Sequence, residues 1–263
     1  MYLLLDIGGT KTRIAGSVDL QSFTEPLVLQ TEQVYEEAIA AIGDAAAQIS
    51  GGIALRGVVV GTPGNKNLPQ WRGRDLAADL KATLYADVHI ENDAALVGLG
   101  EAVYGAGKGA SICVYYTVST GVNGVRIVEG KIDTNRQGFE VGGQYLQMGE
   151  SPKTLEDLVS GTAVAVRFGV SSPRDLGADH PVWEELARTL AIGVHNSILH
   201  WSPDRVVIGG SMMNEIGISV PRVAEHVASM MQKFKTVPEI VHSSLGDVGG
   251  IWGGMARLRQ QDA

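Results

Sequence analysis

The same pattern of strand, glycine turn and strand occurs twice in this chain of 263 residues. In the first copy the apolar residues 1–7 precede a turn over residues 8–12, and a strand pattern resumes at residue 13. In the second copy the apolar residues 111–118 precede a turn over residues 119–124, and a further apolar run follows. P-loop proteins use one phosphate-binding turn, whereas two such turns indicate an internal duplication with a nucleotide between two lobes. The repetition therefore predicts a two-lobed α/β protein.

The first turn has the residue types that bind a phosphate group. Gly8 and Gly9 let the backbone N–H groups approach an anion closely, and Thr10 and Lys11 add a hydroxyl and a positive charge. Asp6, at the end of the preceding strand, is placed to bind Mg²⁺, directly or through water. The alternative is an ordinary Gly-Gly hairpin, which is a common turn without any ligand.

Composition excludes several classes of partner. The chain has 21 basic and 29 acidic residues, a net charge of −8, so no general attraction to the phosphates of nucleic acids is expected. Its single cysteine, Cys113, excludes an intrachain disulfide and a multi-cysteine zinc cluster, which suits a reducing compartment. No leader-like or membrane-length apolar run is present, so we expect a cytoplasmic protein without a membrane partner.

Apolar periodicity and glycine positions suggest where the two lobes divide. We expect an N-terminal lobe over residues 1–104 and a C-terminal lobe over residues 105–263, with the last helix, about 249–261, packing back on the N-terminal lobe. The sequence Gly-Ala-Gly-Lys-Gly at residues 105–109 lacks the spacing of a P-loop, and we interpret it as a flexible link.

Polar residues follow the strand predicted at residues 88–90. Glu91, Asn92 and Asp93 stand at its carboxyl end, immediately before a predicted helix over residues 94–103. Such strand-to-helix junctions are where α/β folds place their chemistry. The alternative for Asp93 is a helix N-cap, for which aspartate is among the preferred residues.

Several segments, in order along nearly the whole chain, resemble the ROK family of sugar kinases and related repressors. They are residues 6–11, 61–64, 67–71, 91–95, 100–101, 119–121, 155–156, 160–161 and 207–211. The resemblance implies a two-lobed actin-like, ribonuclease H-like ATPase fold with duplicated βββαβα-type lobes that close around ATP and a sugar. The repressors carry an N-terminal helix-turn-helix, and a phosphate turn at residue 8 leaves no room for one, so no DNA-binding domain is expected.

The resemblance also implies a role for individual residues. Asp93 matches the general base that accepts the proton of the attacking sugar hydroxyl, and phosphoryl transfer requires such a carboxylate near the nucleophile. The predicted sugar contacts are Asn67, Asn92, Asp93, Glu140 and Glu156. The predicted nucleotide contacts are Gly8, Gly9, Thr10 and Lys11 from the first turn, Thr120 and Gly121 from the second, and Gly209 and Gly210 at the adenosine. Glu140 and Glu156 have the alternative of being solvated surface acids.

Three departures from the family pattern limit this transfer. Gly143 stands where zinc-binding members have a histidine, and no cysteine lies between it and Glu156, so no zinc is expected and residues 143–153 are expected to be mobile. Gln144 is a candidate replacement for the sugar contact of that histidine. Only residues 65–66 remain of a longer hairpin beside the sugar. In the second turn, residues 123–126 replace a glycine-rich series and are expected to reshape the nucleotide contacts.

The combined features predict an ATP- and Mg²⁺-dependent kinase of a small sugar, either a hexose or an N-acetylated or amino hexose. The family commonly forms dimers and tetramers, so a homodimer or homotetramer is expected. One alternative is a catalytically weak sensor of a sugar or nucleotide that keeps the fold. Another is a kinase with a non-sugar acceptor such as a carboxylate, which Asn67, Asn92 and Glu156 disfavour because they suit polyhydroxyl recognition.

Overall fold

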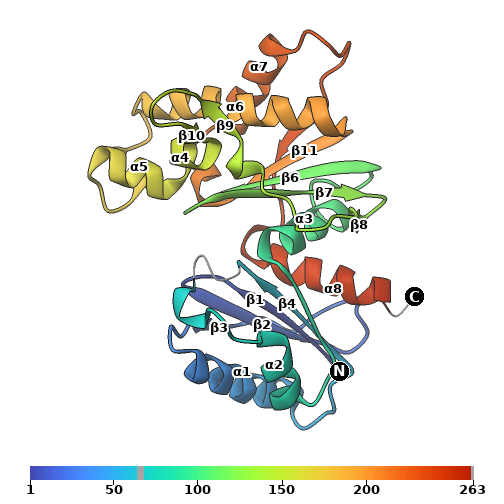
Figure 1. Ribbon diagram of the computed structural model, residues 1–263. Coiled ribbons are helices and arrows are strands. Elements are labelled where there is room, and N and C mark those ends of the chain that lie inside the picture. The colour runs from blue at the N-terminus through green and yellow to red at the C-terminus, as the bar shows by residue number, and fades with distance from the viewer. Residues whose placement is uncertain (64–67, 262–263) are drawn as a thin grey trace. The chain divides into compact units, whose positions relative to one another are not determined.

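The chain forms two compact units in the computed structural model, which describes residues 1–63 and 68–261 (Figure 1). Unit 1 contains Met1–Val103 and the chain from Asp247 onward, and unit 2 contains Tyr104–Gly246. The C-terminal helix α8 (Gly249–Gln261) therefore belongs to unit 1, although it is far from the rest of that unit in sequence.

Unit 1 is built on a five-stranded sheet with the order β3-β2-β1-β4-β5. Its strands are β1 (Tyr2–Ile7), β2 (Lys11–Ser17), β3 (Leu27–Gln30), β4 (Gly57–Thr62) and β5 (Val88–Asn92). The first three form an antiparallel meander, while β4 and β5 run parallel to β1. The strand predicted at residues 88–90 extends to Asn92 as β5, and β3 was not predicted.

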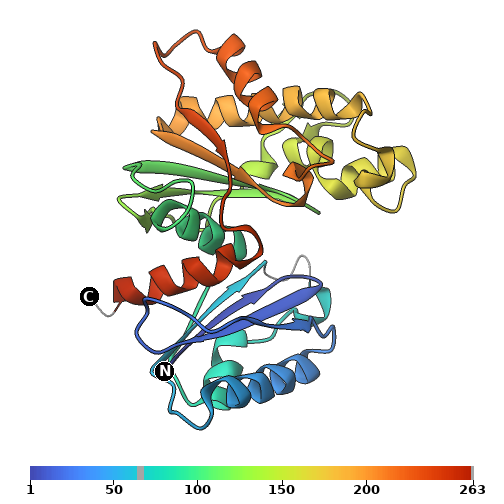
Figure 2. The same cartoon turned by 180° about the vertical axis from the view of Figure 1, so that it is seen from behind.

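Helices cover both faces of this sheet. On one face, α1 (Tyr35–Ser50) and α2 (Leu76–Leu84) bury apolar side chains against Leu3, Leu5 and Ile7. The short 3-10 helix η2 (Pro69–Trp71) joins the same core. On the other face lie α3 (Asp93–Val103) and α8, as both views show (Figures 1 and 2). The alternation of side chains along a strand explains why neighbouring residues of β1 face different helices.

Glycines allow α3 and α8 to pack at unusually short distance. A Cβ atom on Gly253 would lie 1.7 Å from the carbonyl oxygen of Leu96, and one on Gly100 would lie 2.5 Å from the carbonyl oxygen of Gly249. No larger residue fits at either position without moving a helix. This contact fixes the start of α3, and with it Asp93, relative to the sheet.

Unit 2 repeats the topology of unit 1. Its sheet has the order β12-β11-β6-β7-β8. The strands are β6 (Ile112–Val118), β7 (Val122–Val128), β8 (Lys131–Ile132), β11 (Arg205–Gly209) and β12 (Glu239–His242). Again the first three are antiparallel and the last two run parallel to the first. The duplication predicted from the repeated glycine turns is confirmed by this shared strand order.

The core of unit 2 lies between this sheet and its helices. These are α4 (Leu155–Val159), α5 (Gly161–Phe168), α6 (Val182–Trp201) and α7 (Val220–Met230). Single 3-10 turns occur at η3 (Val141–Gly143), η4 (Pro173–Leu176), η5 (Ser211–Met213) and η6 (Gly246–Val248). Among the helices of the described chain, none is long and apolar enough to cross a membrane.

One local expectation needs correction. Strand β7 already begins at Val122, so the second glycine turn covers only residues 119–121, and Asn123 and Gly124 are strand residues. Residues 143–153 include β9 (Tyr145–Gln147), which pairs with β10 (Lys153–Thr154) in a separate two-stranded sheet. The expected mobility of this segment stays a prediction.

Candidate active site

In unit 1, the predicted site residues lie at one edge of the sheet. Asp6 pairs in register with Gly61, which in turn pairs with Glu91, and Asn92 pairs with Thr62. Because β1, β4 and β5 are parallel, their carboxyl ends share this edge, where open α/β sheets bind ligands. The first glycine turn leaves β1 at the same edge, and Thr10 and Lys11 expose their side chains there.

The junction between β5 and α3 assigns separate roles to Asn92 and Asp93. The Oδ1 atom of Asn92 accepts a hydrogen bond from the backbone N–H of Ala95 at 3.1 Å, which is the contact of an N-cap. Oδ1 of Asp93 accepts instead from the N–H of Ala94, at 2.7 Å. The capping role considered for Asp93 thus falls to Asn92, whose side-chain NH₂ group is not used in that contact.

The carboxylate of Asp6 lies in an environment that disfavours its charge. Burial raises the pKa of Asp6 to about 6, with a further upward contribution from the negative charge of Asp93 and an opposing one from Arg13. Arg13 faces Asp6 across the β1–β2 ladder and forms an ion pair with Asp247. A Cβ atom on Gly250 would lie 2.7 Å from Cγ of Asp6, so this glycine is required for the carboxylate to fit beside α8.

The surroundings of Asp6 suit a magnesium ion better than a metal held by protein alone. Within residues 1–63 and 68–261, no group of three or more His, Cys, Asp or Glu side chains is arranged to hold a metal ion. Mg²⁺ is usually bound through one or two carboxylates together with water and substrate phosphates. A buried carboxylate beside a second one fits that description, because a divalent cation relieves the repulsion between them.

In unit 2, the second glycine turn is in contact with Glu156. The backbone N–H of Val122 donates to Oε2 of Glu156 at 2.9 Å, and a Cβ atom on Gly121 would lie 2.7 Å from the same oxygen. The turn is also bonded to α5, since Gly161 N donates to the Ser119 carbonyl at 2.7 Å. Glu156, which is predicted to contact the sugar, is therefore adjacent to the predicted phosphate-binding turn of this unit.

The glycines at the end of β11 are required by packing. A Cβ atom on Gly209 would lie 2.6 Å from Oγ of Ser243, and one on Gly210 would lie 2.3 Å from the Val118 carbonyl oxygen. Gly210 also has a φ of +100°, which side chains with a Cβ rarely adopt. These residues bring the end of β11 against the end of β6, at the carboxyl edge of the sheet.

The other residues considered as sugar contacts lie in different surroundings. Glu140 is exposed at the start of η3. The amide of Gln144, the candidate replacement for a sugar contact, points into the unit. Its Nε2 donates to the Val141 carbonyl at 2.9 Å, and its Oε1 accepts from Asn196 at 3.1 Å. A buried polar cluster around Tyr116 therefore takes up this side chain. Asn67 and residues 65–66 lie outside the described residues.

Sequence reasoning missed several residues that hold the two turns. Thr31 and Gln33 donate side-chain hydrogen bonds to backbone carbonyls of the first turn, and Thr162 donates one to the second. None of them belongs to a recognisable motif. Their contacts join segments more than 20 residues apart, and the only available signal was that polar residues directly follow β3 and open α5.

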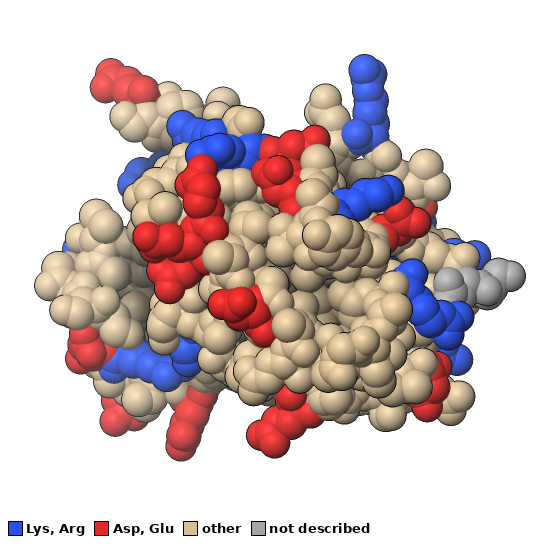
Figure 3. All heavy atoms as spheres, turned by 90° about the horizontal axis from the view of Figure 1, so that it is seen from below, with Lys and Arg blue, Asp and Glu red and all other residues tan. Residues whose placement is uncertain are grey.

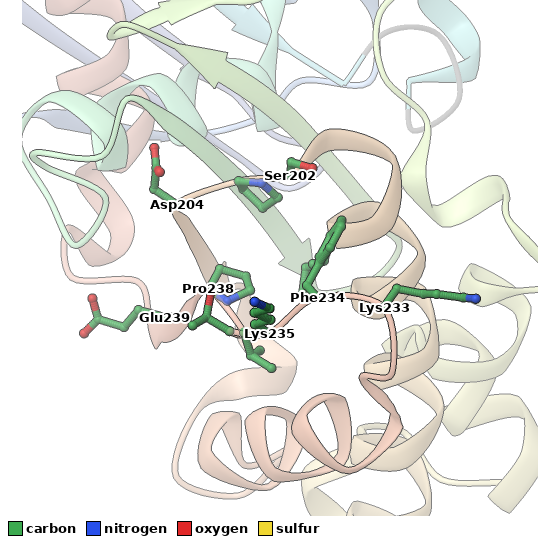
Figure 4. Close-up of a pocket in the computed structure, with 11 residues that line it drawn as sticks. Ser202, Asp204, Lys233, Phe234, Lys235, Pro238 and Glu239 are labelled. Atoms are coloured by element: carbon green, nitrogen blue, oxygen red, sulfur yellow. The ribbon is translucent and has the colours of Figure 1, made fainter.

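A pocket of about 560 Å³ in unit 2 lies away from these residues (Figure 4). It is lined by Ser202 and Asp204, between α6 and β11, and by residues 233–239, which lead into β12. It is therefore at the amino ends of β11 and β12, opposite the edge that carries Gly209. On the face drawn in Figure 3, Lys and Arg side chains are interspersed with Asp and Glu, and the described residues there form no continuous basic surface.

Comparison with known proteins agrees with this geometry. The ROK family model matches residues 2–261. The chain is 28% identical over 201 residues to a fructokinase of Pediococcus pentosaceus, which covers 71% of this chain and 69% of that protein. The solved ROK hexokinase from Thermus thermophilus superposes with a TM-score of 0.84 at 24% identity, covering 100% and 99% of the two chains.

A second solved structure is a ROK family glucokinase from Streptomyces griseus in complex with glucose and AMPPNP. It has a TM-score of 0.81 at 22% identity, over 98% of this chain and 99% of that one. The family match covers nearly the whole chain, and the two-sheet architecture is that of these neighbours. This chain therefore belongs to the ROK family, as a sugar kinase with the actin-like ATPase fold.

Proposed function

We propose that the protein transfers the γ-phosphoryl group of ATP to a hydroxyl group of a hexose or of an N-acetylated or amino hexose, with Asp93 as the general base. The observation that carries this proposal is the position of Asp93. It is the first residue of α3, at the same sheet edge as Asp6, and the helix cap is supplied by its neighbour Asn92. The N-cap hydrogen bond is thus made by Asn92 and not by the carboxylate of Asp93.

In the proposed reaction the sugar hydroxyl loses its proton to Asp93 as its oxygen attacks the γ-phosphorus. The bond between that phosphorus and the β–γ bridging oxygen breaks, and ADP leaves with this oxygen. The backbone N–H groups of residues 8–11, together with Lys11, would bind phosphate oxygens. The turn over residues 119–121 in unit 2 offers N–H groups of the same kind and would also bind phosphate. Asp6 would hold Mg²⁺, which when bound neutralises phosphate charge.

The choice of substrate follows the related kinases. The fructokinase, hexokinase and glucokinase to which this chain is similar all act on hexoses by name, and the glucokinase was solved with glucose and an ATP analogue. In this chain the sugar contacts would come from Asn67, Asn92, Glu140 and Glu156. Because Gln144 turns inward and Gly143 has no side chain, the contact made by a histidine in zinc-binding members is not replaced.

A panel of sugars with Mg-ATP, coupled to ADP release, tests the proposal. The panel contains glucose, fructose, mannose, N-acetylglucosamine and N-acetylmannosamine, with a reaction lacking sugar as the control. We expect sugar-dependent ADP formation with at least one member, and mass spectrometry of that product should find one added phosphoryl group. If no sugar is phosphorylated although sugar or nucleotide binds, the protein is a sensor and the proposal is wrong.

A further inference from the structure

Two threonines outside the predicted site hold the two glycine turns. In unit 1, Oγ1 of Thr31 donates to the Gly8 carbonyl at 2.8 Å, and its backbone N–H donates to the Thr10 carbonyl at 2.8 Å. The Thr31 side chain is buried, at 8% exposure, and its hydroxyl also contacts that of Thr12 at 2.9 Å. Gln33 adds a longer bond of 3.3 Å from Nε2 to the Gly9 carbonyl.

The second turn is held in a similar way. Oγ1 of Thr162 donates to the Thr120 carbonyl at 2.7 Å, and the backbone N–H of Thr162 approaches the same oxygen at 3.3 Å. Gly161 N donates to the preceding carbonyl, that of Ser119, at 2.7 Å. These donors belong to the first turn of α5, whose N–H groups have no partner within the helix itself.

The direction of these carbonyls determines the direction of the neighbouring N–H groups. In a planar trans peptide, the C=O bond and the N–H bond of the next residue point in opposite directions. Bonds to the carbonyls of Gly8 and Gly9 therefore turn the N–H groups of Gly9 and Thr10 away from the Thr31 segment. Bonds to the carbonyls of Ser119 and Thr120 likewise turn the N–H groups of Thr120 and Gly121 away from α5. Successive N–H groups on one side of a turn form an anion-binding concavity.

We propose that Thr31 and Thr162 are positioning residues for the nucleotide, each orienting the N–H groups of one phosphate turn through a hydroxyl-to-carbonyl hydrogen bond. This rests on the proposed function, because it takes the anion at each turn to be a nucleotide phosphate. In this role each threonine acts through the turn that it holds, and not through a contact with the nucleotide. Their effect is to hold each turn in its binding conformation before the ligand arrives, which reduces the conformational cost of binding.

The test compares Thr→Val and Thr→Ser variants by calorimetric titration with Mg-AMPPNP in the absence of sugar. Valine keeps the shape of the side chain without the hydroxyl, whereas serine keeps the hydroxyl. We expect Thr31→Val to raise the Kd about 10-fold, since one hydrogen bond contributes about this factor. Thr162→Val should raise it only about 3-fold, because its backbone N–H still reaches the same carbonyl.

The combined variants separate positioning from general destabilisation. The double variant should weaken binding about 30-fold, since the two threonines share no partner and their effects should multiply. Both serine variants should stay within about twofold of the wild type, and the KM for sugar should not change. Because Thr162 is exposed, its substitution should leave the melting temperature unchanged, so a weaker affinity there does not reflect unfolding.

Two further variants serve as matched controls. Ser17→Ala removes a buried hydroxyl that donates to the Ser22 carbonyl at 2.6 Å, at the far end of β2 from the turn. Thr189→Val removes an exposed hydroxyl that donates to the Glu185 carbonyl at 2.9 Å within α6. Both should leave the affinity for Mg-AMPPNP unchanged. Equal weakening by Ser17→Ala and Thr31→Val would show general destabilisation and overturn the proposal.

The remaining outcomes distinguish this proposal from the proposed function. Valine variants with wild-type affinity, in a protein that phosphorylates a sugar, overturn the positioning role alone. Serine variants as weak as the valine variants also overturn it, because the hydroxyl would then not be the cause. A wild type that binds Mg-AMPPNP but phosphorylates no sugar overturns the kinase assignment, and the variant affinities still decide the positioning role. A wild type that binds no nucleotide overturns both.

Discussion

Asp93 is the residue whose substitution most directly tests catalysis. Asp93→Asn keeps the size of the side chain and an oxygen that can accept from Ala94, but it removes the basicity. If Asp93 is the general base, kcat should fall by about 10² to 10⁴, while the Kd for Mg-AMPPNP stays near the wild-type value. Steady-state kinetics and calorimetry measure the two quantities. Near-normal turnover in a variant with a wild-type melting temperature would contradict the assignment.

Asp6 should lower the stability of the metal-free protein at neutral pH. Its pKa is raised from 3.8 to about 6 on folding, so its contribution to stability is fully present below pH 4 and is lost as the pH rises through 6. At pH 8 the charged carboxylate then costs about 3 kcal/mol relative to a neutral group. We therefore expect Asp6→Asn to melt roughly 5 to 10 °C higher than the wild type at pH 8 in the presence of a chelator.

The gain in stability from Asp6→Asn should shrink at pH 5, where the wild-type carboxyl is mostly protonated in the folded state. Asp44→Asn, an exposed position on α1, is the matched control and should show no gain at either pH. In the kinase assay Asp6→Asn should be impaired, because it removes the proposed magnesium ligand. A melting temperature below that of the wild type at pH 8 would show that Asp6 contributes favourable contacts that outweigh its buried charge.

At the scale of elements, we expect the contact between α3 and α8 to require glycine at position 253. Gly253→Ala places a methyl group where the backbone of Leu96 now lies, so one helix must move. We expect a net loss of at least about 2 kcal/mol in the free energy of unfolding, even after the gain in helix propensity. Displacement of α3 should also reduce kcat, since Asp93 begins that helix.

Gly143→Ala provides the matched control for Gly253→Ala. A Cβ atom on Gly143 meets nothing within 4 Å, and its φ is not positive. The substitution should leave the free energy of unfolding unchanged or raise it by about 0.5 kcal/mol, through the unfolded state. Urea denaturation of both variants measures the difference. Similar stabilities for the two alanine variants would show that α3 and α8 separate easily.

At the scale of the whole molecule, we expect the purified protein to contain no stoichiometric zinc. The chain has one cysteine, which is buried in β6, and the residues that the structure describes include no group suited to hold a metal ion without a substrate. Elemental analysis after dialysis should find well under one zinc per chain, and EDTA should not change the melting temperature. About one retained zinc per chain would contradict this, as would a loss of stability on chelation.

The whole-molecule architecture was largely predictable from the sequence, whereas the details of the site were not. Glycine turns at residues 8–12 and 119–124, each between apolar runs, predicted the duplication, and the helices predicted at residues 94–103 and about 249–261 are α3 and α8. The edge strands β3 and β12 were missed because each has only four residues, too few for a strand periodicity to stand out in the sequence. The second turn was predicted three residues too long, since strand pairing rather than composition determines that β7 begins at Val122.

The sequence by itself determined which residues gather at the site. The order of its glycine and acidic segments identified the ROK family, and parallel strands necessarily bring their carboxyl ends to one edge. Only the tertiary structure decided what the individual side chains do there. It assigned the cap of α3 to Asn92, turned Gln144 inward, and placed the hydroxyl of Thr31 on the Gly8 carbonyl. Most of these outcomes depend on distances between segments remote in sequence, and competing hydrogen-bond partners decide them all, so local residue preferences do not reveal them.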